Sequence, residues 1–242
     1  FSKPDKLKTW LEGEGLPLAE REHLITDAGC LAKGLSIVND EVEFFCHSPF
    51  IKHCDEGEDL RNSAALIFQV RFQVDNVITN YWAVGDTTYE VLEDVVDITQ
   101  YHNNDDRLDW DILNIPHHCS YKVLADDKGD KETIPTEKVK DWLLHGQNDS
   151  YLVSSSQPIN NDQDAYEQVQ PPHIQAKNCY QSYLDQVGGR TLLVTMEEPN
   201  ETKPEPLVFE IGGDGHRLKA KLITGAASIV SAAAPRAGRG GQ

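Results

Sequence analysis

Apolar and polar residues alternate most regularly in the stretch LIFQVRFQV, residues 66–74. The apolar members of this alternation are Leu66, Phe68, Val70, Phe72 and Val74, and the polar members are Gln69, Arg71 and Gln73. A period of two predicts a β-strand that buries one of its faces. Asp75-Asn76 then forms a compact turn, and residues 77–84 return as a partner strand that stops at Gly85-Asp86. The pattern therefore predicts a β-hairpin.

Apolar residues at helical spacing predict four helical segments, at residues 5–33, 88–101, 136–146 and 171–189. The last segment starts at Pro171-Pro172 and ends at Gly188-Gly189, residues that favour the two ends of a helix. Further strands are predicted at residues 42–46, 108–116, 150–156, 190–196, 206–211 and 216–224. Polar loops are expected at residues 55–59, at 125–135 and after residue 156.

The order of these elements is mixed, because a hairpin comes first, strands alternate with helices next, and a second hairpin ends the fold. This order predicts an α/β (α+β) fold whose sheets are covered by helices on their outer faces. We expect three parts in the chain. Residues 1–34 form an N-terminal helical segment, residues 35–224 form the main domain, and residues 225–242 form a flexible tail rich in Gly, Ala and Arg.

Composition narrows the classes of function. The 242 residues carry a formal net charge of −18 and no stripe of Lys and Arg, which argues against a nucleic-acid footprint unless a bound cation reverses the charge locally. The five cysteines form no CxxC pair, so we expect reduced thiols in a cytoplasmic protein. Neither a signal peptide nor an apolar run of membrane-spanning length is present, so we expect no membrane association.

The candidate chemistry lies where two predicted strands end. Asp86 follows Gly85 at the end of the first hairpin, and His117 and His118 follow Pro116 at the end of strand 108–116. The carboxyl ends of strands are where α/β folds place ligands and catalytic groups. Imidazole and carboxylate groups suit zinc, manganese or iron. The alternative interpretation is that Gly85-Asp86 turns the chain and that the two histidines are ordinary side chains at a second turn.

Taken together, the hairpin ending in VGD, the helix, and the segment DWDILNIPHHCS resemble the distal half of the metallo-β-lactamase fold. The resemblance is greatest to the branch related to the DNA-uptake protein ComEC, where a strand ending in Gly-Asp precedes Pro-His-His-Gly-Ser. It covers roughly residues 35–211. It implies a metallo-β-lactamase-type αββα sandwich, of which this chain supplies the C-terminal half.

The resemblance also implies a site and an activity. Asp86, His117 and His118 would be catalytic, with Asp86 and His117 binding one or two divalent ions, zinc first and manganese as the alternative. The roles of the two histidines could be reversed. Ser120, His118 and His173 would contact substrate, although His173 could instead be a surface histidine at a helix start. The implied reaction is metal-assisted hydrolysis of a phosphodiester or related bond, in a nucleic acid or nucleotide.

Two features depart from the family pattern. Cys119 replaces the glycine of His-His-Gly-Ser, which we expect to be tolerated if the backbone there is not left-handed, with the thiol buried and neutral. The family's main metal motif, His-x-His-x-Asp-His, occurs nowhere among the nine histidines. Because the chain starts without Met, we expect that this proximal half was removed or belongs to a companion chain.

Half a sandwich would expose apolar strand faces, so we expect the companion half or a homo-oligomer to cover them. A different class of function stays open, namely a non-catalytic scaffold or partner-binding module that keeps the fold without the metal. The absence of the proximal motif is its main support.

Overall fold

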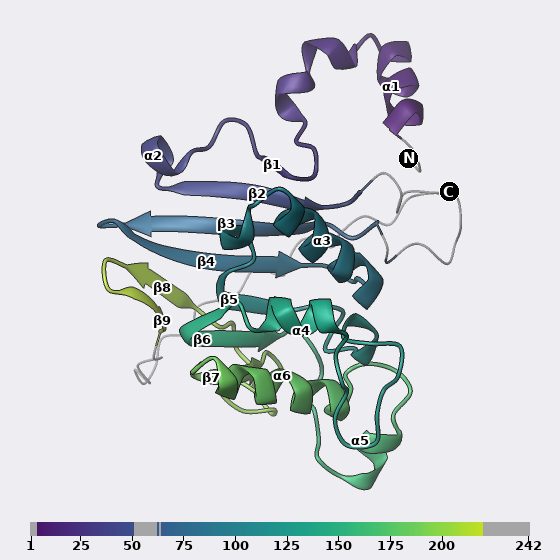
Figure 1. The fold of residues 1–242 in the computed structure, drawn as a ribbon, viewed down its shortest axis with the longest axis vertical. Coiled ribbons are helices and arrows are strands. Elements are labelled where there is room, and N and C mark those ends of the chain that lie inside the picture. The colour runs from purple at the N-terminus through teal and green to yellow at the C-terminus, as the bar shows by residue number, and fades with distance from the viewer. Residues whose placement is uncertain (1–3, 51–61, 63, 220–242) are drawn as a thin grey trace.

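The structure, a computed structural model, describes residues 4–50, 62 and 64–219. At its centre is a seven-stranded sheet whose strands lie side by side in chain order (Figure 1). The first four strands are antiparallel to their neighbours, and the last four run parallel. The strands are β1 Cys30–Leu31, β2 Val42–Ser48, β3 Ile67–Val74, β4 Val77–Val84, β5 Trp110–Ile115, β6 Gly146–Ser154 and β7 Thr191–Val194. The chain is therefore a mixed α/β protein, and the predicted class is confirmed.

Three helices connect the parallel strands and cover one face of the sheet, called here the helix side (Figure 1). They are α3 Tyr89–Tyr101, α4 Glu137–Leu143 and α6 Ile174–Gln186. The core between these helices and the sheet contains Trp82, Trp110 and Trp142, all fully buried. The shorter helices are α1 Pro4–Gly13, α2 Ile37–Asp40, α5 Gln163–Glu167 and the 3-10 turns Leu18–Glu20, Glu22–Leu24, Asp105–Arg107 and Tyr121–Val123. None of the helices in the described ranges is long and apolar enough to cross a membrane.

The opposite face, called here the hairpin side, receives the two short strands β8 Phe209–Gly212 and β9 Gly215–Leu218. The hairpin is fixed by Tyr151, whose ring lies 5.1 Å from Phe209 and 5.8 Å from His216. Strand alternation places a further row of apolar side chains on the hairpin side. Val70 in this row is 2% exposed, and the others are only partly buried: Val42, Phe44, Phe68, Phe72, Val74, Val77, Tyr81 and Ala83. One face of the sheet is thus closed by helices, and the other is apolar and half-covered.

The predicted hairpin is confirmed, with Asp75 and Asn76 in the turn at φ angles of 49° and 66°. Its predicted burial is wrong in one respect, since Gln69 was expected on the exposed face and is fully buried. Gln69 Nε2 donates to the carbonyl oxygens of Asp106 and Asp109, at 3.3 and 2.9 Å. The polar row of β3 therefore faces the helix side, where two loop carbonyls accept from the Gln69 amide nitrogen while the Gln69 Oε1 atom is buried without a hydrogen-bond partner among the described residues.

The predicted helix over residues 5–33 is wrong beyond α1, which ends at Gly13. Gly15 takes a left-handed conformation at φ 71°, and Pro17 follows it. These two residues interrupt the helix because glycine favours a C-terminal cap and proline cannot continue the hydrogen-bond ladder. The chain instead makes two 3-10 turns and enters the sheet as β1. The predicted loop at 55–59 and tail at 225–242 lie outside the described residues.

Candidate functional site

The candidate site lies at the carboxyl ends of three adjacent strands. Asp86 comes two residues after β4, His117 and His118 follow β5, and Ser155 follows β6. Asn114 near the end of β5 donates its Nδ2 hydrogen to the carbonyl oxygen of Val84 in β4, at 3.1 Å. This bond holds the two strand ends together across the start of the site. The structure therefore places Asp86 and the histidine pair at one end of the sheet, beside the carboxyl ends of β4 and β5, where the sequence predicted them.

The histidine pair lies in a turn of left-handed backbone. His117, His118 and Cys119 have φ angles of 49°, 52° and 66°. Each such residue costs roughly 1 to 2 kcal/mol, because the Cβ crowds the following carbonyl. The turn is closed by Cys119 N donating to Pro116 O at 3.1 Å and by Ser120 N donating to His117 O at 3.0 Å. Three consecutive non-glycine residues in this region indicate backbone strain of the kind that clusters at functional sites.

We expected Cys119 to replace glycine without cost only if its backbone were not left-handed. The backbone of Cys119 is left-handed, so the replacement carries a cost. Burial of its side chain, which is fully inaccessible, offsets part of that cost. Burial also raises the pKa of the Cys119 thiol to about 12, so the thiol is protonated at neutral pH. The interpretation of Cys119 as a neutral buried thiol agrees with this environment.

His118 is oriented by a backbone carbonyl. Its Nδ1 lies 2.7 Å from the carbonyl oxygen of Ser155, which can only accept, so Nδ1 carries the proton. The Nε2 lone pair is then free, and Nε2 lies 3.7 Å from Asp86 Oδ1. About half of each side chain, 53% for His118 and 50% for Asp86, is exposed. Two lone-pair donors at this separation do not bond each other, but they are spaced to share a cation.

His117 repeats the arrangement. Its Nδ1 lies 3.3 Å from the carbonyl oxygen of Thr87, which leaves its Nε2 free as well. Metal-binding histidines typically donate one ring N–H to a carbonyl or carboxylate and coordinate through the other nitrogen. Donor atoms that share one tetrahedral zinc lie roughly 3.4 Å apart, given zinc distances of about 2.0 to 2.1 Å. The distance from His118 Nε2 to Asp86 Oδ1 is close to this value, so His118 is the histidine that the structure brings beside Asp86.

His173 is placed differently. It is 1% exposed, so the alternative of a surface histidine is wrong. Its Nδ1 accepts a hydrogen bond from Tyr121 N at 3.4 Å, and its Nε2 donates to Val169 O at 3.1 Å. Its backbone N also donates to Cys119 O, at 3.0 Å. Burial lowers the pKa of His173, so it is a neutral brace for the left-handed turn, and neither ring nitrogen is left for a ligand.

Ser120 is also buried, with its hydroxyl accepting from Lys122 N at 3.3 Å as the cap of the 3-10 turn Tyr121–Val123. The bracing groups at Thr87 and Ser155 are backbone carbonyls, so no side-chain signal in the sequence could have identified them. Among the residues described, no three His, Cys, Asp or Glu side chains converge to hold a metal ion. Within the described part of the chain, Asp86 and His118 therefore stand as a pair of potential ligands without a third beside them.

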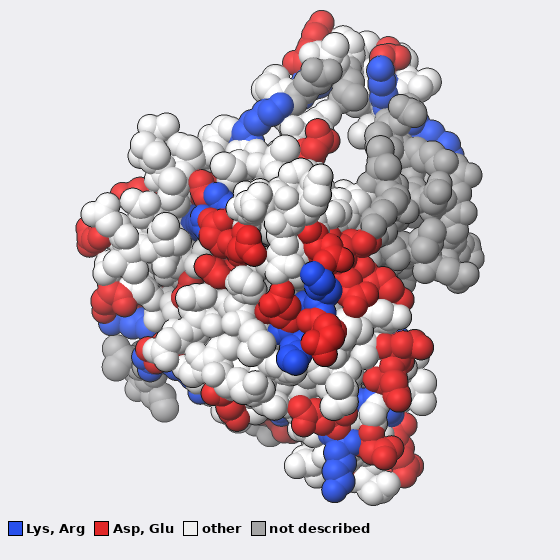
Figure 2. Space-filling view, viewed as in Figure 1, with Lys and Arg blue, Asp and Glu red and all other residues white. Residues whose placement is uncertain are grey.

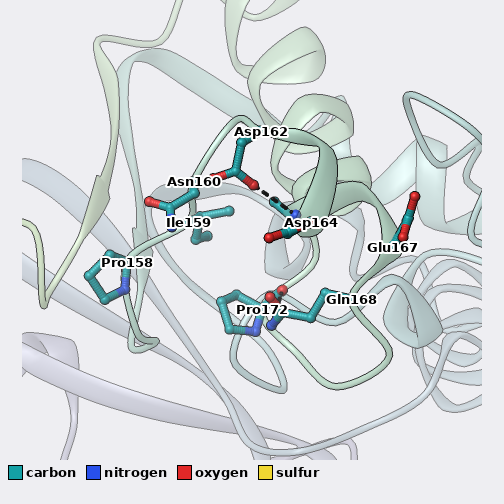
Figure 3. Close-up of a pocket in the computed structure, with 9 residues that line it drawn as sticks. Pro158, Ile159, Asn160, Asp162, Asp164, Glu167, Gln168 and Pro172 are labelled. Carbon is teal, nitrogen blue, oxygen red and sulfur yellow. Dashed lines mark hydrogen bonds between the residues drawn. The ribbon is translucent and has the colours of Figure 1, made fainter.

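The loop between β6 and α6 encloses a pocket of about 350 Å³ next to α5 (Figure 3). Its lining includes the carboxylates of Asp162, Asp164 and Glu167, and Asp162 accepts from Ala165 N to cap α5. Acidic side chains also dominate the helix side of the surface, with few Lys and Arg between them (Figure 2). A pocket of this charge repels phosphate groups, so it does not extend the candidate site toward a phosphodiester.

Comparisons with protein-family models, with curated proteins and with solved structures found no match to the chain. The candidate site therefore depends on its own geometry and on the sequence resemblance described above. That geometry consists of the two braced histidines, the neighbouring carboxylate and the strained turn that presents them.

Proposed function

We propose that this protein is a metal-dependent hydrolase of the metallo-β-lactamase superfamily, whose Asp86 and His118 contribute to binding a divalent cation. One observation carries the proposal. Two consecutive histidines each use Nδ1 on a backbone carbonyl and keep Nε2 free, and one Nε2 lies 3.7 Å from an exposed carboxylate. Imidazole and carboxylate together favour zinc, with manganese as the alternative.

The fold supports the superfamily assignment at the level of architecture. An αββα sandwich has two sheets packed face to face and helices on both outer faces. The chain has a sheet with helices on one side and an apolar, partly covered opposite side. The hairpin side is where we propose that the second sheet packs, and the site edge is where the two halves would meet.

The remaining ligands belong, in this proposal, to a proximal half that carries His-x-His-x-Asp-His, either in the same protein or in a companion chain. Two donors do not hold a zinc ion firmly, since such sites use three or four protein ligands. Among the described residues, no three potential ligands converge, so we propose that a second segment contributes the others. We propose the proximal half as the partner of the hairpin side because it would complete the site and the sheet packing together.

The cation would supply Lewis-acid stabilisation and lower the pKa of a water molecule for attack on a phosphodiester or related bond. Asp86 and His118 would hold it, and the Thr87 and Ser155 carbonyls would fix the tautomers of His117 and His118. His117 has a free Nε2 of its own, so it is either a further ligand or a proton carrier at the substrate. Phosphodiester chemistry is favoured by the resemblance to the ComEC-like branch alone.

Zinc and manganese binding to the purified chain, measured by isothermal titration calorimetry, tests the proposal. We expect weak binding that His118→Gln and Asp86→Asn each weaken by about ten-fold or more, because each removes a ligand. His102→Gln is the matched control, since His102 is an exposed histidine at the end of α3, and it should leave the affinity unchanged. Circular dichroism spectra that superimpose for all four proteins show that the fold is retained.

Equal affinities for the wild type and both site variants would remove Asp86 and His118 from the site. The scaffold function would then be favoured, since no three potential ligands converge in the described part of the chain. Loss of affinity in His117→Gln but not in His118→Gln would keep the metal site and reverse the roles of the two histidines.

A further inference from the structure

Cys30 and Cys46 lie directly opposite each other in the sheet. They are register partners of the antiparallel pair β1–β2, so their side chains point to the same face. Cα atoms of directly opposed residues are about 4.5 to 5.5 Å apart, within the range that a disulfide spans. Both thiols are free. The sequence alone could not indicate this pair, because no CxxC spacing is involved.

The backbone around Cys30 can yield to a cross-link. Gly29 has a φ of 80°, and its N–H, rather than that of Cys30, donates to Cys46 O at 2.7 Å. This is the arrangement of a glycine β-bulge, in which two residues oppose one. β1 is only 2 residues long and forms the edge of the sheet. A short edge strand next to a bulge moves at little cost, so the two sulfur atoms can approach bonding distance.

The four thiols in the described residues differ in access. Cys119 and Cys179 are buried, and burial raises the pKa of each to about 12. Cys46 is partly buried, with its pKa raised mainly by that burial, and its thiol donates to Ser48 O at 3.4 Å. Cys30 is exposed. An external oxidant therefore reaches Cys30 first, because thiolate exchange requires access to the attacking sulfur.

We propose that Cys30 and Cys46 form a reversible disulfide that fastens the N-terminal segment, residues 4–41, to the edge of the sheet. The oxidant class is a low-molecular-weight disulfide. The Cys30 thiolate attacks one sulfur of the oxidant, breaks its S–S bond and releases one thiolate. The Cys46 thiolate then attacks the Cys30 sulfur and releases the second thiolate. Two cysteine thiols lose two protons and two electrons, and the oxidant is reduced to two thiols.

The link joins a segment that is otherwise held to the sheet by few backbone bonds. Three of these bonds run from Gly29 N to Cys46 O, from Ala32 N to Phe44 O and from Gln73 N to Glu41 O. The opposed pair lies in a ladder position where side chains are farther apart than in the alternate position, so the bond would carry some strain. Strained and exposed disulfides are the more easily reduced ones, which is why we assign a reversible link rather than a permanent one.

Tryptic mapping of the folded chain tests this proposal, because Lys33 is the only Lys or Arg between the two cysteines. After incubation with glutathione disulfide, we expect peptides 22–33 and 34–52 to be joined by a disulfide as the dominant species. Excess reduced glutathione should separate them. Cys46→Ser should instead accumulate a mixed disulfide between Cys30 and glutathione, and Cys54→Ser should form the link like the wild type.

Two results would overturn the proposal. One is a wild-type protein that stops at the mixed disulfide on Cys30, since the second thiol would then be out of reach. The other is a link from Cys30 to the peptide containing Cys54, which the Cys54→Ser variant would abolish. Zinc affinity is measured separately on the reduced chain, so this proposal stands or falls independently of the metal site.

Discussion

Phe44 and Phe45 are neighbours on β2 and point to opposite faces of the same sheet. Phe45, on the helix side, is 6% exposed, with its ring 4.9 Å from His47 and 5.2 Å from the Arg107 guanidinium carbon. Phe44, on the hairpin side, is only partly buried, with its ring 5.8 Å from Phe68. The helix side of β2 and β3 carries polar as well as apolar side chains and is closed by loops and helices, whereas the hairpin side carries mainly apolar side chains and is only half-covered. The difference shows that, among the described residues, the helix side is packed more completely than the hairpin side.

The largest expected effect on the free energy of unfolding comes from alanine substitutions at Phe45 and Phe44. Phe45→Ala should lower the free energy of unfolding by about 3 to 5 kcal/mol, because it leaves a cavity in a closed core. Phe44→Ala should lower it by about 1 to 2 kcal/mol, since the lost side chain is partly solvated already. Urea unfolding of the two variants measures the difference. Equal losses would mean that the hairpin side is as completely packed as the helix side.

The next largest effect is a dependence of stability on pH, which arises from a buried histidine on the helix side. His47 on the helix side stacks on Trp82 with a ring distance of 4.5 Å, and burial lowers its pKa to about 3. The unfolded chain, with His47 near its ordinary pKa, therefore binds a proton that the folded chain does not, and stability falls as pH drops below about 6.5. The loss from this residue should be about 2 kcal/mol at pH 5.

Other groups titrate in the same range, so a variant must isolate His47. The hydrogen bond that His145 Nδ1 donates to Asp109 Oδ1 raises the pKa of His145, which makes the free energy of unfolding increase as pH falls through this window. Subtracting the pH profile of His47→Gln from that of the wild type removes the His145 contribution. A difference profile that is flat between pH 7 and 5 would contradict the assignment of His47 as a buried neutral group.

Much of the fold could be predicted because hydrophobic periodicity depends on residues that are close together in the sequence. The period-2 run gave β3 and β4, and apolar stripes gave α3 and α6 to within a few residues. The burial of Gln69 could not be predicted, because its partners are the carbonyls of Asp106 and Asp109, more than thirty residues away. The same holds for β1, which forms only because β2 offers it an edge.

The site was less predictable than the fold. The sequence placed Asp86 and the histidine pair at strand ends, and the structure brings them to one edge. Which histidine lies beside Asp86 depends on the left-handed turn, whose backbone conformation no side-chain pattern encodes at non-glycine residues. The burial of His173 was missed for a related reason, since its partners are backbone groups of Tyr121 and Val169.

The smallest expected effect on the free energy of unfolding comes from a substitution on the hairpin side. Phe68→Lys places a charge among partly exposed apolar side chains and should cost the isolated chain about 1 kcal/mol or less, because the ammonium can reach water. Its effect on association should be much larger, since an unpaired charge in a sheet interface must be desolvated.

If the hairpin side is a packing face, the wild-type chain should self-associate as its concentration rises in sedimentation velocity runs and should bind a hydrophobic dye. Phe68→Lys should then be monomeric at concentrations where the wild type is not, while Lys138→Glu, at a partly exposed position of α4 on the helix side, should associate as the wild type does. A wild-type chain that remains monomeric and binds no dye would show that the hairpin side is already closed, and the proposed second sheet would have no surface on which to pack.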